Sequence, residues 1–311
     1  MAAVSAVLRR GVNARRASRN GEAPGRKPRS VFSLPALVMY SLFVIYPTVA
    51  TIYYSFTNWN GLGNHWHFVG LANFRAVLAS SLERTALGNT VEATVGIVIG
   101  ANLLGLILAV LLQRSSRLNY VLRLLWFLPA ALPSIVAGYI WTFLYSPQGP
   151  LDAIWHFFDP SGIPPGFIGD PHQALASVAA IAIWQSSGYA MVILLAGLKA
   201  IDPQLHEAAT IDGASPWQRF RRVMLPLLRP AFTVSIVLST VSGLLLFDAV
   251  VATTDGGPGY ATETLATQLY KQAFLFNDFG FGMAMGVLIA LLVLIVTGVL
   301  LFTLNRNEAR S

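Results

Sequence analysis

The sequence has 311 residues, of which 55% are hydrophobic and 11% are charged, and its mean hydropathy is +0.59. Soluble domains carry about 25% charged residues, so this composition excludes an ordinary water-soluble globular protein. The net charge is +7 and cysteine is absent, which excludes disulfides, zinc–thiolate sites and thiol catalysis.

Six long stretches without Asp, Glu, Lys or Arg predict six transmembrane helices. A span needs about 20 mostly apolar residues, and in lipid it must be helical because its backbone polar groups find no water. The predicted spans are Val31–Tyr54, 93–113, 124–151, 171–198, 230–247 and 279–305. The sequence therefore predicts an all-α integral membrane domain over residues 31–305.

Basic residues set the predicted orientation of these spans. Eighteen of the 21 Lys and Arg residues lie in the two terminal tails and in the connections after the second and fourth spans. The positive-inside rule therefore places both termini in the cytoplasm. Because the positive charge lies beside apolar runs, we attribute it to membrane topology and expect no nucleic-acid partner. Residues 1–30 are predicted to be a disordered, uncleaved basic tail and 306–311 a short cytoplasmic tail.

The predicted outer loops are rich in aromatic and turn-forming residues. Within the loop 146–172, Leu151–Phe158 is expected to form a short amphipathic helix anchored at the interface by aromatic side chains. A plug or substrate-facing role is the alternative for this helix. In the third span, Pro129 and Pro133 are expected to produce a kink.

The cytoplasmic connection 199–229 has a distinct pattern of helix starts and stops. Asp202-Pro203 and Ser215-Pro216 each place a capping side chain before a proline at the first helical position. Gly213 suits the left-handed residue that often ends a helix. The pattern predicts a helix over about 203–212, a sharp turn, and a second short helix.

The same connection resembles the EAA loop of binding-protein-dependent ABC importer permeases. The match is Glu207-Ala-Ala, three residues, Gly213, nine residues, Val223, one residue and Leu225-Pro226, where the family favours Ile in place of Val223. Other segments are similar to the carbohydrate branch, of maltose and glycerol-phosphate permease type. These are Phe68–Phe74, Asn89-Thr90, Phe127–Pro129, Ile183-Trp184, Gly188-Tyr189, Leu195–Leu198, Phe247-Asp248 and Gly256–Pro258.

The resemblance implies a type I ABC importer permease (MetI-like) fold in the cell membrane of a prokaryote. It implies a second permease subunit, a cytoplasmic ATPase dimer that binds ATP and Mg, and an extracytoplasmic solute-binding protein. The chain itself has no Walker A spacing around its three lysines, so no cofactor is expected in it. The residues that the resemblance assigns to ATPase coupling are Glu207, Ala208, Ala209, Asp212, Gly213, Ala214, Phe220 and Pro226.

A sugar pathway calls for aromatic faces and hydrogen-bonding side chains with little charge. The candidates are Trp184, Gln185, Tyr189, Asn102 and Asp248. Helix packing is the alternative role for the first four, and a structural hydrogen bond is the alternative for Asp248. His65 and His67 have no neighbouring acids or cysteines, so no metal site is expected.

Two other functions remain open at this point. A stand-alone secondary transporter or channel could use Glu92 and Asp248 for ion coupling, but it leaves the capped cytoplasmic loop unexplained. A membrane-embedded enzyme is disfavoured because no span pairs a nucleophile with a base. The sequence favours a transporter subunit that is not itself an enzyme.

Overall fold

The computed structural model describes residues 34–63 and 65–308, so the predicted tail 1–30 and residues 309–311 lie outside it. In the described part of the chain the regular elements are helices, and one isolated β-bridge joins Thr57 and Phe68. The chain forms two units, Met1–Ala50 and Thr51–Ser311. The all-α prediction is confirmed.

The predicted spans correspond to four long helices and two bent pairs. Among the described residues, the helices long and apolar enough to cross a membrane are Leu34–Tyr54, α5 (Ser81–Leu111), α9 (Pro171–Ala200) and Phe279–Leu304 of α16 (Phe279–Glu308). The first of them is made of α2 (Leu34–Tyr40), the π-helix η2 (Ser41–Ile45) and α3 (Tyr46–Tyr54). Six spans result if each bent pair counts as one.

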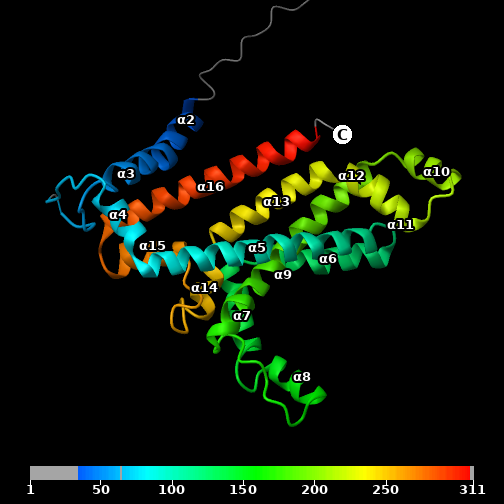
Figure 1. Cartoon of the computed structure of the whole chain (residues 1–311), viewed down its shortest axis with the longest axis horizontal. Helices are drawn as coiled ribbons and strands as arrows, with labels where there is room; N and C mark the ends of the chain where they lie inside the picture. The colour runs from blue at the N-terminus through cyan, green and yellow to red at the C-terminus, as the bar shows by residue number, and fades with distance from the viewer. Residues whose placement is uncertain (1–33, 64, 309–311) are drawn as a thin grey trace, which may run out of the picture. The chain divides into compact units, whose positions relative to one another are not determined.

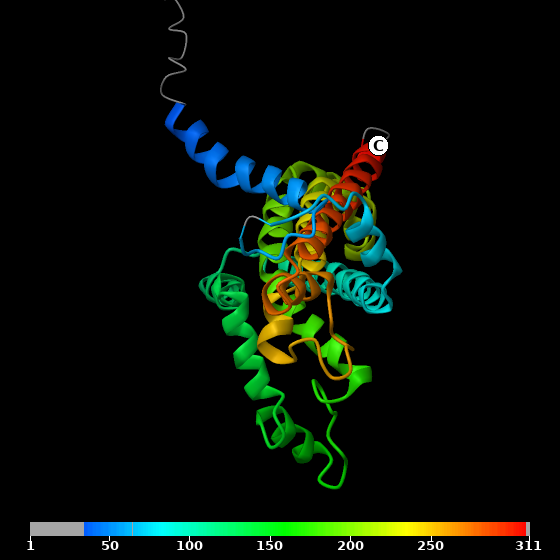
Figure 2. The same cartoon turned by 90° about the vertical axis from the view of Figure 1, so that its left-hand side faces the viewer.

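The third predicted span, 124–151, carries the kink expected at its prolines, but the bend is sharper than a kink within one helix and the bounds differ. It consists of α6 (Arg117–Ala131) and α7 (Ser134–Leu144), which meet at an angle of 102°. Figure 2 shows α6 nearly end-on, with α7 turning away from it. Pro133 lacks an N–H and therefore cannot bond the carbonyl of Pro129, so the helix breaks there.

The fifth predicted span ends earlier than expected. Helix α13 (Arg229–Leu244) stops before residue 247 and bends by 66° from the preceding segment Pro216–Leu227. The chain turns at Leu245–Phe247, and the carbonyl of Leu246 accepts a hydrogen bond from Thr264 Oγ1 at 2.8 Å. A second short helix, α14 (Asp248–Thr253), follows this turn.

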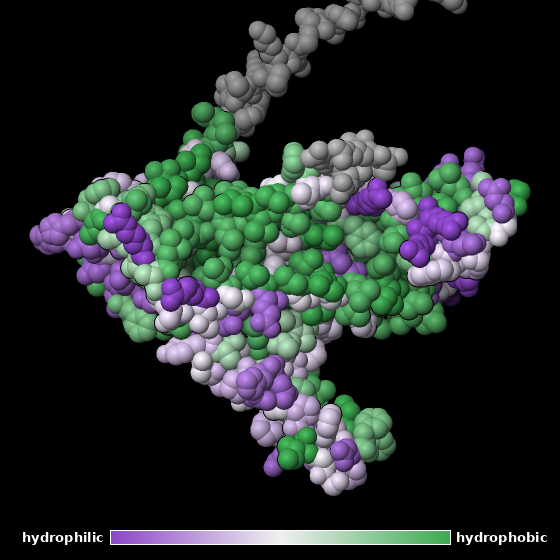
Figure 3. Space-filling view, viewed as in Figure 1, coloured by the Kyte–Doolittle hydropathy of each residue, from purple (hydrophilic) through white to green (hydrophobic). Residues whose placement is uncertain are grey.

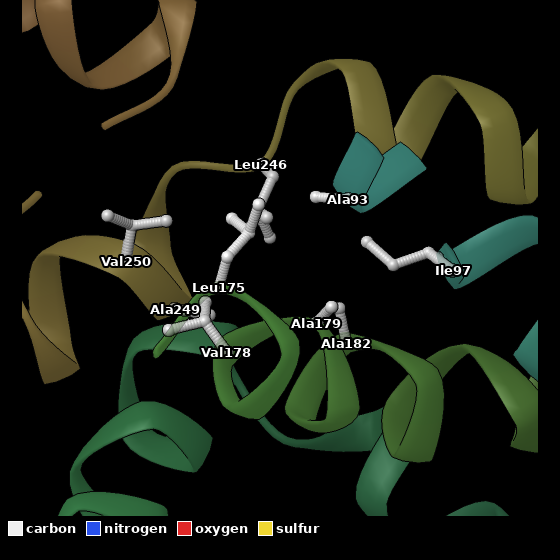
Figure 4. Packing of buried hydrophobic residues seen from close by; sticks show 9 residues of the cluster. All are labelled: Ala93, Ile97, Leu175, Val178, Ala179, Ala182, Leu246, Ala249 and Val250. Carbon is white, nitrogen blue, oxygen red and sulfur yellow. The ribbon is translucent and has the colours of Figure 1, made fainter. Parts of the chain in front are cut away.

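Helices α5, α9, α13 and α14 pack together in the interior of the bundle. Figure 4 shows apolar side chains of α5, α9, the α13–α14 turn and α14 facing one another. Among them, Ile97, Val178 and Val250 are fully buried. Close packing depends on small residues: a Cβ added at Gly243 would lie 2.8 Å from the Cα of Thr94. Such small-residue crossings let membrane helices approach closely.

Shorter helices connect these spans. They are α4 (Ala72–Ala79), α8 (Pro150–Phe158), α10 (Pro203–Ile211), α11 (Pro216–Arg219), η3 (Phe220–Met224), α12 (Leu225–Leu227), α15 (Leu265–Tyr270) and η4 (Lys271–Leu275). The helix predicted over Leu151–Phe158 is thereby confirmed as α8. Within Thr51–Ser311, α10 and α11 lie at one end of the helical bundle, and α14 and α15 lie towards the other (Figure 1).

Apolar side chains cover the flanks of the spans. On the face shown in Figure 3, hydrophobic residues form a continuous surface over α13 and α16, and hydrophilic residues gather at α10 and α11. A soluble protein rarely exposes so large an apolar surface. The surface fits a bilayer, with the α10–α11 segment in the aqueous phase.

Candidate functional site

The connection 199–229 folds as its capping pattern predicts. The Asp202 side chain accepts a hydrogen bond from Gln204 N at 2.9 Å, which starts α10. Ser215 and Gln218 form a reciprocal capping box that starts α11. Each cap satisfies an orphan backbone N–H at a helix start.

The turn between α10 and α11 is fixed by its backbone conformation and by a hydrogen bond between side chains of the two helices. Gly213 has a φ of +74°, which glycine adopts without steric cost. The guanidinium of Arg219 donates from Nη1 to Thr210 Oγ1 at 2.6 Å, so α11 is tied to the end of α10. The two helices are therefore presented as one preformed element.

The outer surface of this element combines polar and apolar side chains. Of the predicted coupling residues, Glu207, Ala208, Asp212 and Gly213 are exposed, whereas Ala209, Ala214, Phe220 and Pro226 are half-buried. Three large apolar side chains are also exposed on it: Leu205 (44% exposed), Ile211 (85%) and Trp217 (66%). Large apolar residues on short helices in a predicted aqueous loop are a signal that the sequence already carries.

The base of the element is anchored in the membrane bundle. Met224 and the fully buried Leu228 belong to one cluster with Ala109 of α5 and with Leu194 and Leu198 of α9. Phe220 packs against the same cluster, and its ring stacks on Trp217 with centroids 5.7 Å apart. Met224 and Leu228 thus join the base of the α10–α11 element to α5 and α9.

A cavity of about 480 Å³ lies between α9, α13, the α6–α7 break and the α13–α14 turn. Three of the five predicted pathway residues line it: Gln185, Tyr189 and Asp248. Five serines that sequence reasoning missed also line it, namely Ser134, Ser186, Ser235, Ser239 and Ser242. Ser235, Ser239 and Ser242 recur at i, i+4 and i+7 along α13, a helical period that the sequence carries. Their meeting with Ser134 and Ser186 across the cavity is decided only by tertiary packing.

Two cavity residues also stabilise the break between α6 and α7. Gln185 Nε2 donates to the carbonyls of Pro129 and Leu132, both at 3.1 Å. The hydroxyl of Tyr189 donates to the carbonyl of Ala130 at 2.7 Å. These bonds replace the backbone N–H partners that the carbonyls lose at the break around Pro133. Inside a membrane protein such carbonyls need a partner, because no water is there to bond them. Gln185 and Tyr189 therefore shape the cavity wall as well as facing the cavity.

The remaining pathway candidates lie behind the wall. Trp184 packs edge-on against Trp141, with ring centroids 5.6 Å apart, and Asn102 donates to Ser239 Oγ at 3.0 Å. Neither lines the cavity, so for these two the packing alternative fits the structure. Glu92 is exposed on α5 and does not line the cavity with Asp248. Over the described ranges no group of three His, Asp or Glu side chains could hold a metal ion.

Comparisons with known proteins agree with this arrangement. Residues 101–309 match the family model of the binding-protein-dependent transport system inner membrane component. A probable ABC transporter permease protein of Pyrococcus horikoshii is 36% identical over 90% of this chain and 96% of its own length. The trehalose/maltose transport system permease protein MalF of Thermococcus litoralis is 32% identical, over 85% and 89% respectively.

A solved structure shares the fold. The chain is similar, with a TM-score of 0.77 and 19% identity, to a chain of a bacterial ABC transporter involved in the import of the acidic polysaccharide alginate. The match covers 89% of this chain and 94% of that chain.

Proposed function

The chain belongs to the family of inner membrane components of binding-protein-dependent transport systems, and from that premise we propose that it forms half of the membrane pathway of an ATP-driven importer for a sugar or related polyol. It is a permease subunit with multiple membrane-spanning helices, and it is not itself an enzyme. The observation that carries the proposal is that α9 contacts both functional features. Its Leu194 and Leu198 pack on the base of the α10–α11 element, and its Gln185 and Tyr189 line the cavity.

The proposed ATPase contact is the exposed face of α10 and α11. Leu205, Ile211 and Trp217 are its exposed large apolar residues, and Glu207 adds a carboxylate. A short helix that presents apolar anchors is suited to a groove on a partner, in which the anchors are desolvated. ATP and Mg would bind to that partner, and movement of its subunits would displace α10 and, through Met224 and Leu228, the spans.

The substrate proposal rests on the chemistry of the cavity wall. Serine hydroxyls and the single carboxylate of Asp248 offer hydrogen bonds, and the rings of Tyr189 and Phe247 offer aromatic surface, as polyhydroxylated molecules require. The relative from Thermococcus litoralis is named for trehalose/maltose transport, which supports the same class. A second permease chain would complete the pathway, and an extracytoplasmic binding protein would deliver the substrate. The apolar flanks would contact lipid.

Co-purification tests this proposal. The tagged chain is expressed with its neighbouring genes, extracted in mild detergent, and its bound partners are identified. We expect an ATPase and a second permease to remain bound, and both the ATPase and sugar uptake to be lost when residues 207–213 are scrambled. Scrambling residues 151–157 of α8 is the matched control and should leave the ATPase bound. A solitary chain that takes up a solute with an ion gradient would contradict the proposal and favour a stand-alone secondary transporter.

The Glu207→Lys variant makes a finer test of the same contact. Because Glu207 is exposed on α10, the substitution should leave folding intact and separate ATP hydrolysis from uptake. Normal ligand-stimulated ATPase activity together with normal uptake would refute a coupling role for Glu207.

A further inference from the structure

A buried ion pair lies between the α14–α15 connection and η4, and no sequence pattern marked it. The carboxylate of Glu263 is fully buried, and its Oε2 lies 2.9 Å from Nζ of Lys271. Its Oε1 accepts a hydrogen bond from Thr267 Oγ1 at 2.7 Å. A buried ion pair is seldom more stabilising than apolar side chains of the same size. Stability alone therefore does not account for its presence.

The pair holds a strained stretch of backbone. The left-handed residues of this stretch are Asp255 (φ 46°), Gly256 (φ 88°), Gly259 (φ 59°) and Tyr260 (φ 66°). Non-glycine residues keep such a conformation only where the surroundings impose it. Lys271 Nζ donates to the carbonyl of Asp255 at 2.8 Å, and a Cβ at Gly256 would collide with the Glu263 carboxylate. The two charged side chains therefore clamp the start of the stretch.

The clamped segment is joined to both α5 and the cavity wall. Asn89 Nδ2 donates to the carbonyl of Glu263 at 2.9 Å, which fixes the segment on α5. The next residue, Thr264, donates from Oγ1 to the carbonyl of Leu246 at 2.8 Å. Leu246 lines the cavity, and Asp248 follows it on the same wall. The position of Asp248 thus depends on the segment that the ion pair holds.

We propose that Glu263 and Lys271 are positioning residues of the transport pathway, which fix the α13–α14 turn so that Asp248 faces the cavity. This inference rests on the proposed function, since it concerns the wall of the same cavity. The pair acts through Thr264 and Leu246, and neither Glu263 nor Lys271 lines the cavity. Loss of either charge releases the strained segment and lets the turn move, which weakens substrate binding without disconnecting the ATPase loop.

Cysteine accessibility measures this position directly, because the natural chain contains no cysteine. Asp248→Cys reports on the turn, and Ser186→Cys on α9 is the reference site in the same cavity. Each is labelled with a small thiol reagent in the full importer complex, with and without Glu263→Gln. We expect Glu263→Gln to change the labelling rate of the cysteine at residue 248 by roughly tenfold. The labelling rate at residue 186 should stay within about twofold of its value without Glu263→Gln, because a local opening affects only its own segment.

A double variant distinguishes the positioning role from a simple failure to fold. Glu263→Gln combined with Lys271→Met buries no unpaired charge, so it should fold even if the single variant does not. It still lacks the bond from Lys271 to Asp255, and we expect the same change at residue 248. Wild-type labelling in the double variant would show that the pair serves stability alone and would overturn the proposal. Equal changes at both cysteines would overturn it too, since they indicate general loosening.

Uptake kinetics in the cysteine-free background separate this proposal from the proposed function. For Glu263→Gln we expect a raised KM for uptake with a maximal rate within about twofold of wild type, whereas a coupling defect would lower the rate itself. Asp152→Asn removes the Asp152–His156 pair of α8 and is the matched control, with an unchanged KM expected. An unchanged KM in Glu263→Gln would refute the positioning role. A wild-type complex without ATP-dependent uptake would refute the proposed function, and the labelling comparison would still decide the role of the pair.

Discussion

The turn between α10 and α11 offers a sharp test because the cost of a substitution there can be derived from the backbone. Gly213 has a φ of +74°, and nothing lies within 4 Å of the Cβ that a larger residue would add. Gly213→Ala therefore meets no steric clash with neighbours, and its cost is the left-handed backbone conformation, about 1–2 kcal/mol. If the partner ATPase binds only the native turn, its affinity should fall by roughly 5- to 30-fold.

A second glycine provides a matched control for this prediction. Gly63 also has a φ of +74° and open space around its added Cβ, but it lies in the connection between α3 and α4. Gly63→Ala should carry the same backbone cost and leave the affinity for the ATPase unchanged. Gly213→Asn should have a smaller effect than Gly213→Ala, because asparagine tolerates the left-handed conformation better.

The assay is the dissociation constant between the ATPase and the membrane subunits in detergent, measured for each variant at one salt concentration. Thermal unfolding of the membrane subunits is followed in parallel, to show that any loss of affinity is local. Wild-type affinity in Gly213→Ala would refute the reasoning. Equal losses in Gly213→Ala and Gly63→Ala would also refute it, since the α10–α11 turn would then have no special role.

Three further predictions concern the bundle and the cavity. Gln185→Leu leaves the carbonyl of Leu132 without its amide partner and that of Pro129 with only the N–H of Leu132, so it should lower the free energy of unfolding by about 1–3 kcal/mol, measured by denaturation in mixed micelles. An unchanged value would show that water replaces the amide. Gly105→Ala places a Cβ 2.5 Å from that of Ala190 and should destabilise the chain by about 1–3 kcal/mol. Gly96→Ala on the same helix meets open space and should not destabilise it. Equal thermal midpoints for the two variants would contradict the packing argument. Asp248→Asn keeps the shape of the cavity wall and removes its carboxylate, so it should raise the KM for sugar uptake by roughly tenfold and leave ATPase binding intact. Unaltered uptake kinetics would exclude a contact between Asp248 and the substrate.

The sequence by itself determined the features that depend on short-range physics. Uncharged runs long enough to cross a bilayer located the spans, because burying charge in lipid is costly. The helix start at Asp202, the capping box at Ser215 and the left-handed turn at Gly213 were predictable since each involves backbone groups within a few residues.

Only the tertiary structure decided how the spans bend and which side chains meet. Prolines in the third span indicated a kink, but a 102° break is stabilised by Gln185 and Tyr189, which lie more than 50 residues away. Asp248 lines the cavity next to a turn that is held by Thr264 from a later segment, whereas Asn102 bonds Ser239 and does not line the cavity. Contacts between residues so distant in the chain leave no periodic trace in the sequence, and they appear only when helices pack and their remaining polar groups must find partners inside the bundle.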